Sequence, residues 1–214
     1  MRKKKFKFYA LKLCFWMFVI FLIQLLIKGF TELFLLDNHV FTQVWRFLTA
    51  IFLHGSFVHL LYNSFALALF GSILEKLIGG RRFLFVFFAA GILANIVSVN
   101  FYDSSLGASG AIFGVIGALI LVRPMLTVWA FGLPMPIFVA GIIWAAGDLL
   151  GAIGYLTGNP INDTGNIAHL SGLFVGLLMG IFYRKRFSLI ENQNSPRVLV
   201  HEGSMRAWED RWIR

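Results

Sequence analysis

The feature that most constrains the fold is a series of apolar segments, each nearly free of charge and each long enough to cross a lipid bilayer. A helix rises about 1.5 Å per residue and the hydrocarbon core is about 30 Å thick, so a span needs about 20 mainly apolar residues. Only 14% of the 214 residues are charged, whereas soluble domains average about 25%. We therefore expect an all-α membrane protein.

Six apolar segments predict six transmembrane helices. They cover about residues 8–27, 59–77, 83–99, 109–123, 136–156 and 166–183. Residues 28–58 mix polar and apolar positions, which favours a long, partly inserted loop with short amphipathic helices. Residues 125–135 contain Gly132 and Pro134 and are expected to form a connector. The predicted organisation is a basic N-terminus (1–7), a six-helix core (8–183) and a polar tail (184–214).

The distribution of the basic residues predicts the orientation of these helices. The net charge is +9, and the positive residues gather at the ends of apolar segments: in residues 1–7, at Lys76, Arg81, Arg82 and Arg123, and in the tail. With six spans, all of these positions fall on one side of the membrane. The positive-inside bias then predicts that both termini are cytoplasmic in a multi-pass protein of the cell membrane. A lipid bilayer, and no nucleic acid, is the partner that this charge pattern indicates.

Ser109 lies where a polar loop becomes the fourth apolar segment, and it is flanked by Gly107 and Gly110. Small neighbours leave its hydroxyl uncovered, and a helix start leaves backbone N–H groups available to a negative charge. The ordinary interpretation is a helix N-cap, since serine is a preferred capping residue. The sequence around Ser109 does not by itself separate capping from catalysis.

Predicted topology brings three distant polar residues to a similar depth. His59, Ser109 and His169 each lie within about a turn of the outer beginning of a predicted span. A serine hydroxyl and a neutral imidazole are the nucleophile and the general base of acyl transfer. Glycines recur below both residues and would let the two helices approach closely; they are Gly110, Gly114 and Gly117 in one segment and Gly172, Gly176 and Gly180 in the other.

The remaining polar residues suggest supporting roles. His59 and Asn63 lie one helical turn apart and would offer hydrogen-bond donors to an oxyanion, although such a pair also joins neighbouring helices in many membrane proteins. His54 is expected to hold the preceding loop by hydrogen bonds, and Phe113 to pack against the His169 ring without an acidic third member. Asp148 is predicted to be structural, because it lies too deep in the fifth segment to reach the outer third of the membrane.

Together these residues resemble the rhomboid family of intramembrane serine proteases. The resemblance rests on an ordered set spanning residues 8–183: Trp45-Arg46, His54-x4-His59-x3-Asn63, Gly107-x-Ser109-Gly110 and Ala168-His169-x2-Gly172-x3-Gly176. It implies a Ser109–His169 dyad, with His59, Asn63 and the Ser109 amide binding the oxyanion. It also implies single-span transmembrane substrates cut near the outer face, at a site open to the extracytoplasmic side, and no cofactor. Phe113 stands where several members of the family have tyrosine.

Two alternatives remain at the level of the sequence. A catalytically inactive rhomboid-like protein would bind membrane proteins or act in quality control, but it would be expected to lack the nucleophile or the base. A metal transporter or metalloenzyme would use His54, His59 and His169 as ligands. The sequence contains no HExxH motif and only one cysteine, Cys14, so no metal site is predicted.

Overall fold

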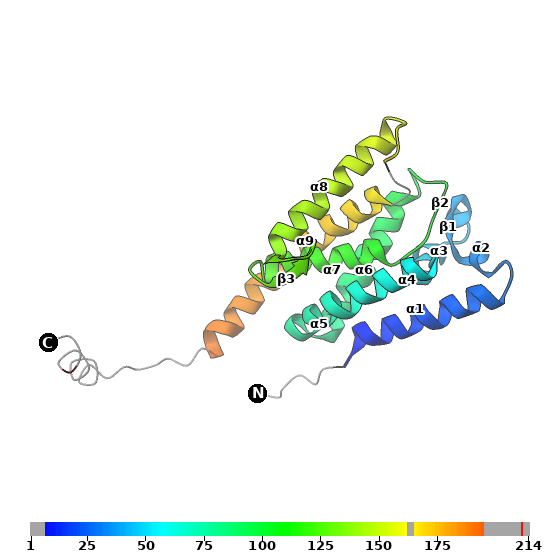
Figure 1. The fold of residues 1–214 in the computed structure, drawn as a ribbon. Coiled ribbons are helices and arrows are strands. Elements are labelled where there is room, and N and C mark those ends of the chain that lie inside the picture. Colours follow the sequence, from blue (N-terminus) through cyan, green and yellow to red (C-terminus); the bar gives the residue numbers. More distant parts are fainter. Residues whose placement is uncertain (1–6, 162–164, 195–210, 212–214) are drawn as a thin grey trace.

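The computed structural model describes residues 7–161, 165–194 and 211. The described helices are α1 (Tyr9–Leu26), α2 (Phe30–Phe34), α3 (Arg46–Thr49), α4 (Phe57–Ala66), α5 (Ser72–Ile78), α6 (Gly80–Ser98), α7 (Ser109–Val122), α8 (Ile137–Leu156) and α9 (Asn166–Asn194). A π turn, η3 (Leu67–Gly71), joins α4 to α5, and two 3-10 turns, η1 (Asn38–Phe41) and η2 (Ala50–Phe52), lie in the first long loop. The helices form a bundle in which α1 and α8 lie at opposite edges (Figure 1).

Five helical segments are long and apolar enough to cross a membrane. They are α1, the continuous stretch Phe57–Ile78, α6, α8 and the part of α9 from Asn166 to Arg184. The fourth predicted span forms α7, which has only 14 residues and therefore extends about 21 Å. Helix α9 continues past the predicted end of the sixth span, and most of the predicted tail lies outside the described residues.

Large apolar side chains cover the outside of the bundle. Leu26 is 83% exposed and Phe182 is 75% exposed, and many others follow along α1 and α8. A soluble surface would not carry so much contiguous apolar area. The exposed surface therefore has the character of a surface that contacts lipid.

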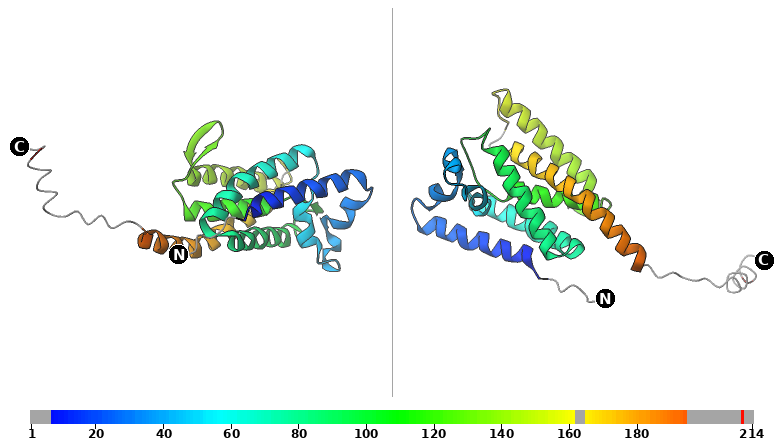
Figure 2. Two further views of the ribbon diagram at one scale, coloured as in Figure 1. Left: turned by 90° about the horizontal axis from the view of Figure 1, so that it is seen from below. Right: turned by 180° about the vertical axis from the view of Figure 1, so that it is seen from behind.

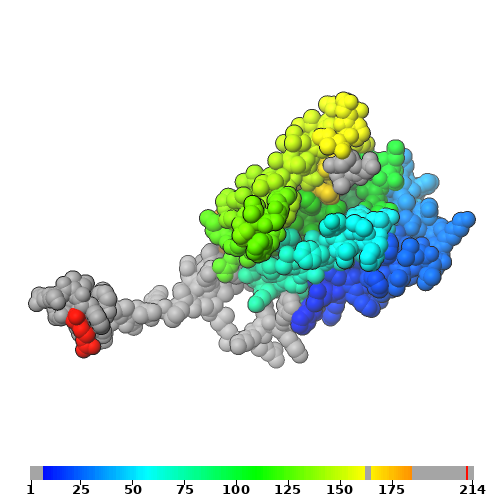
Figure 3. All heavy atoms as spheres, viewed as in Figure 1, coloured from blue at the N-terminus to red at the C-terminus, as the bar shows by residue number. Residues whose placement is uncertain are grey.

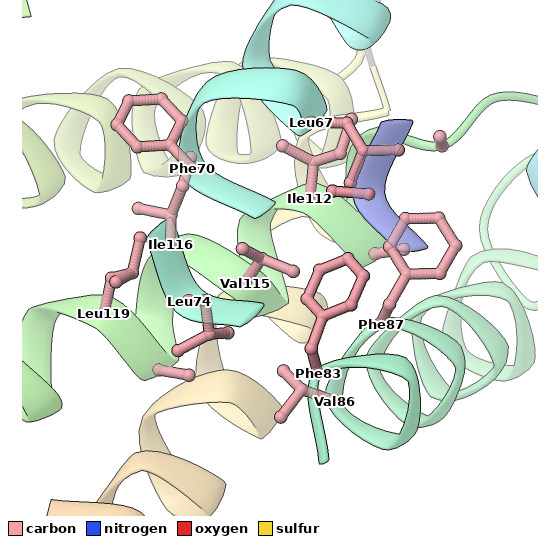
Figure 4. Packing of buried hydrophobic residues seen from close by; sticks show 14 of the residues in the cluster. Leu67, Phe70, Leu74, Phe83, Val86, Phe87, Ile112, Val115, Ile116 and Leu119 are labelled. Carbon is pink, nitrogen blue, oxygen red and sulfur yellow. The ribbon is translucent and has the colours of Figure 1, made fainter. Parts of the chain in front are cut away.

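Helix α7 lies at the centre of the packing and contacts α9 more extensively than any other two described elements contact each other. Its inward side chains join those of η3, α5 and α6 in the main hydrophobic cluster (Figure 4). Ile112, Val115 and Leu119 of α7 belong to this cluster together with Phe83 and Phe87 of α6, and Val115 lies beside Phe83. A short helix surrounded in this way is held mainly by its neighbours.

The start of α1 and the end of α9 lie at the same end of the bundle (Figures 1 and 2). Glu75 near the end of α5 lies at that end too, because its Oε2 accepts a hydrogen bond of 3.1 Å from the backbone N–H of Ala10. This arrangement places the predicted basic loops at one end. The first turns of α4, α7 and α9 lie at the other end.

Two small sheets interrupt the predicted all-helical fold. The connector after α7 is a hairpin of β3 (Thr127–Ala130) and β4 (Leu133–Pro136). Its two turn residues, Phe131 and Gly132, have φ angles of 55° and 78°, as a tight hairpin turn requires. At the opposite end, β1 (Leu36–Asp37) pairs with β2 (Ser104–Ser105) and ties the first long loop to the loop before α7.

The first long loop contains short helical elements, as predicted, and is organised around Arg46. This side chain is only 4% exposed. Its guanidinium donates to the carbonyl oxygens of Glu32 and Leu35, to Gln43 and to Asp37, whose Oδ2 lies 3.1 Å away. The loop thus forms a fixed support beside α4 and α6.

Candidate active site

A cavity of about 870 Å³ opens among the ends of α4, α7, α8 and α9. The predicted site residues that line it are Ser109, His169, His59, Asn63, Gly107 and Gly110. Figure 3 shows the face on which α4 and α8 approach each other, with α7 behind them. The structure therefore brings these residues to one end of the bundle, as their shared depth predicted.

Ser109 is the first residue of α7 and does not cap it. The N-cap is Ala108, and no side chain caps the helix by a hydrogen bond. The capping interpretation of Ser109 is therefore wrong. Its half-buried hydroxyl lines the cavity, and its backbone N–H is among the first four of the helix, which have no acceptor within the helix.

His169 lies in the first turn of α9, where its ring stacks on Phe113 of α7. The ring centroids are 4.4 Å apart and the planes differ by 7°. No hydrogen bond joins the described side chains of Ser109 and His169. In enzymes, catalytic hydrogen bonds are often long without substrate, so this geometry does not exclude a catalytic pair.

Asp148 of α8 contacts the His169 ring at its Nδ1 atom. Its Oδ1 lies 3.0 Å from Nδ1 of the imidazole, and the two side chains are 10% and 12% exposed. The prediction that Asp148 lies too deep to reach the site was wrong, as was the expectation that His169 has no acidic neighbour. The sequence did contain an indication that Asp148 takes part in the site, because an ionisable residue inside a membrane helix usually has a functional role.

Gly107 allows the imidazole of His59 to approach the chain just before Ser109. Its φ is +127°, a conformation that L side chains rarely adopt, and an added Cβ would lie 2.7 Å from Cε1 and 2.9 Å from Nε2 of His59. Nδ2 of Asn63 would lie 3.9 Å from the same point. The donors of His59 and Asn63 therefore face the backbone beside Ser109.

Asn63 is a buried donor without a partner. The side chain is 6% exposed, and Nδ2 makes no hydrogen bond among the described residues. A buried polar atom left unpaired costs about 1–3 kcal/mol. A ligand oxygen in the cavity would remove that cost.

His54 lies behind His59 and holds the loop that precedes α4. Its backbone N–H and carbonyl both bond to the side chain of Gln24 in α1, and its Nδ1 lies 3.2 Å from the carbonyl oxygen of Phe52. Its ring meets that of His59 edge to face, with centroids 5.0 Å apart. Burial, with a smaller effect from the nearby His59, lowers the pKa of His54 to about 4, so the ring is neutral at pH 7.

Tyr102, in the loop before α7, is a cavity residue that the sequence reasoning missed. Its hydroxyl accepts a hydrogen bond of 3.1 Å from the backbone N–H of Ile167, in the first turn of α9. Burial raises the pKa of Tyr102. An isolated tyrosine in a loop carries no sequence signal for such a contact.

The described residues contain no group of three His, Cys, Asp or Glu side chains arranged to hold a metal ion. His54 and His59 lie together, whereas His169 is engaged by Asp148 and Phe113. The cavity is therefore lined by a serine, by an imidazole that contacts a carboxylate and by the unpaired amide donor of Asn63. Hydrolysis by a serine nucleophile would use groups of these kinds.

The fold defines a multi-pass helical membrane protein, and Ser109 and His169 line one cavity at the ends of its helices. Comparison with known sequences agrees, because residues 42–186 match the Rhomboid domain. The chain belongs to the rhomboid family.

Several relatives named as proteases or as rhomboid-like proteins are similar to the chain. Rhomboid protease GluP of Bacillus subtilis is 49% identical over 80 residues, which is 36% of this chain and 16% of that protein. Rhomboid protease GlpG of Haemophilus influenzae is 31% identical over 146 residues, 67% of this chain and 72% of that protein. RHOMBOID-like protein 7 of Arabidopsis thaliana is 33% identical over 157 residues, 72% of this chain and 48% of that protein. The matched part of the chain thus spans less than half the length of GluP and of RHOMBOID-like protein 7.

Proposed function

We propose that the protein is an intramembrane serine endopeptidase that cleaves transmembrane proteins, with Ser109 as nucleophile and His169 as general base. The observation that carries this proposal is a serine hydroxyl that lines a cavity at a helix start without capping the helix, together with an imidazole on the same cavity. The names of the relatives support a protease.

The mechanism follows from the groups around the cavity. Ser109 Oγ attacks the substrate carbonyl carbon while Nε2 of His169 takes the hydroxyl proton. The carbonyl oxygen becomes an oxyanion, and the Ser109 N–H with the side chains of His59 and Asn63 donates hydrogen bonds to it. The intermediate collapses, the C–N bond breaks, and His169 returns the proton to the leaving amine.

Hydrolysis of the acyl-enzyme completes the cycle. His169 takes a proton from a water molecule, which attacks the carbonyl carbon of the acyl group bound to Ser109 Oγ. The second tetrahedral intermediate collapses to a free carboxyl group, and the proton returns to Ser109 Oγ. The volume of the cavity, about 870 Å³, leaves room for water as well as a short unwound stretch of substrate.

The proposal extends to topology. We take α7 as the fourth of six membrane helices, short because it is enclosed by the others, within a core of residues 8–183. The basic ends of the segments favour cytoplasmic termini in the cell membrane. The cavity would then open to the extracytoplasmic side, and single-span membrane proteins would be cut near that face.

The experiment that tests the proposal is cleavage of a single-span reporter in proteoliposomes. Ser109→Ala and His169→Ala are each expected to abolish cleavage. The matched controls are Ser171→Ala, whose hydroxyl bonds the Ile167 carbonyl within α9, and His39→Ala, whose side chain is 69% exposed. Both controls should cleave. Cleavage by Ser109→Ala would refute the mechanism, and a folded wild-type protein that cleaves no reporter would favour the inactive rhomboid-like alternative.

A further inference from the structure

We propose that Asp148 is a positioning residue for His169, which fixes the tautomer of the imidazole and stabilises its protonated form during catalysis. This inference rests on the proposed protease function. It adds a third member, supplied by α8, to the pair formed by α7 and α9.

The contact between Asp148 and His169 belongs to a regular register between two antiparallel helices. Three residues beyond Asp148, a Cβ on Gly151 would lie 2.3 Å from Nδ2 of Asn166, and Asn166 lies three residues before His169. The pairs 148–169 and 151–166 are therefore successive contacts on one helix–helix seam. The packing of α8 on α9 therefore places Asp148 and His169 within reach of each other.

A carboxylate at this position determines which ring nitrogen carries the proton. A neutral imidazole has one N–H donor and one acceptor nitrogen. Because a carboxylate accepts hydrogen bonds only, Asp148 Oδ1 at 3.0 Å from Nδ1 selects the form with the proton on Nδ1. Nε2 then holds the lone pair that a general base needs.

Phe113 and Asp148 restrict different motions of the same ring. The stacked phenyl ring, with its centroid 4.4 Å away, fixes the plane of the imidazole. The hydrogen bond at Nδ1 fixes its rotation within that plane. The ring is thus oriented before substrate arrives, which is the main function of a group that supports a general base.

Electrostatics support the same role. When His169 accepts the serine proton it becomes positive, and the carboxylate behind it lies in a largely dry site where charge pairs interact strongly. Besides His169, the titratable groups that line the cavity are His59 and Tyr62 from α4, Tyr102 from the loop before α7 and Tyr155 from α8. None of these four is a carboxylic acid, and Asp148, which contacts His169 at Nδ1, supplies the negative charge next to the imidazole.

The first test compares the kinetics of Asp148→Asn and Asp148→Glu with those of Asp103→Asn, which removes the same charge from an exposed loop position. Asp148→Asn keeps the shape of the side chain but replaces the carboxylate with an amide. Because an amide can donate as well as accept a hydrogen bond, it also permits the tautomer of His169 with the proton on Nε2. We expect kcat to fall at least about 10-fold with KM changed less than about 2-fold. Asp148→Glu should recover part of kcat, and Asp103→Asn should match the wild type.

The second test needs no variant of Asp148. In wild-type protein labelled with 15N-histidine, in detergent micelles at neutral pH, the His169 ring should carry its proton on Nδ1, as assigned by loss of the signal in His169→Ala. A His169 ring protonated on Nε2 alone would overturn the proposal, even if Asp148→Asn fails to fold.

The outcomes separate this inference from the proposed function. If wild type cleaves, Ser109→Ala does not, and Asp148→Asn cleaves with wild-type kcat, the positioning role is overturned and the protease stands. If Ser109→Ala still cleaves, the protease mechanism itself fails. A reduced kcat with unchanged KM, partial rescue by Asp148→Glu and the Nδ1 proton together support the proposal.

Discussion

Helix α9 meets its two neighbours α7 and α8 in different ways. Against α7 the contact is between backbones: a Cβ on Gly172 would lie 1.9 Å from the Gly110 carbonyl oxygen, and one on Gly176 would lie 1.9 Å from that of Gly114. Against α8 the contact is made by side chains, through Asp148 on His169 and through Asn166 at Gly151.

This difference in the kind of contact suggests a different function for each of the two seams. A contact between backbones cannot adjust without moving a helix, so the α7–α9 seam determines where Ser109 and His169 lie. A contact through side chains can change without moving a helix, so the α8–α9 seam adjusts the chemistry of an imidazole that is already in place. Substitutions along the two seams should therefore affect stability and activity in different proportions.

The largest effect is expected for Gly176→Ala in the α7–α9 seam. The new methyl group would overlap the Gly114 carbonyl oxygen at 1.9 Å, and backbone cannot move aside cheaply. We expect the free energy of unfolding to fall by about 3 kcal/mol or more, with cleavage lost. Unfolding in mixed micelles, followed by circular dichroism, measures the first quantity. Stability equal to that of the wild type would show that this seam is not close-packed.

Gly151→Ala in the α8–α9 seam should lower the free energy of unfolding less than Gly176→Ala does. Its methyl group would meet the Asn166 side chain, with Nδ2 at 2.3 Å and Cγ at 2.6 Å, and a side chain can rotate away. We expect a loss of about 1–2 kcal/mol and a lower kcat, because the first turn of α9 carries His169. The same unfolding and cleavage assays apply. A loss as large as that of Gly176→Ala would remove the distinction between the seams.

Phe113→Leu tests an aromatic contact that crosses the α7–α9 seam at the site. Leucine keeps an apolar side chain but loses the parallel face 4.4 Å from the imidazole. Aromatic pairs contribute about 0.5–1.5 kcal/mol, which corresponds to a decrease in kcat of about 2- to 10-fold. Phe113→Tyr retains the ring and serves as the control. Equal kinetics for Leu and Tyr would show that the stack does not orient His169.

The smallest effect is expected for Gly147→Ala, which is one residue from Asp148 but on the outer face of α8. An added Cβ there would have nothing within 4 Å. Alanine is the better helix former by about 1 kcal/mol, so we expect a small gain in stability and wild-type cleavage. Reduced cleavage would mean that α8 must bend or move at this point during the reaction.

Much of this arrangement was predictable from the sequence. Apolar length predicted the five helical segments that are long enough to cross a membrane, and the order of polar residues predicted that His59, Ser109 and His169 meet at one end. The glycines of α7 and α9 predicted a close approach, because residues without side chains are the ones that let helices touch.

Asp148 was misjudged because sequence alone does not give the depth at which each helix begins. The side chain of Asn166, the first residue of α9, lies at Gly151, so α9 starts about 7 Å below the end of α8. The site is correspondingly set back from this end of the bundle, and a residue in the C-terminal half of α8 reaches it. The β3–β4 hairpin was missed because a phenylalanine at positive φ, Phe131, is an uncommon turn residue.

The most direct measurement is labelling of the purified protein with a fluorophosphonate, followed by identification of the modified residue by mass spectrometry. An activated serine reacts with this reagent, whereas an ordinary hydroxyl does not. The account predicts a label on Ser109 in the wild type and in Ser171→Ala, and none in His169→Ala. A folded wild-type protein that is not labelled, or equal labelling of Ser109 in His169→Ala, would contradict it.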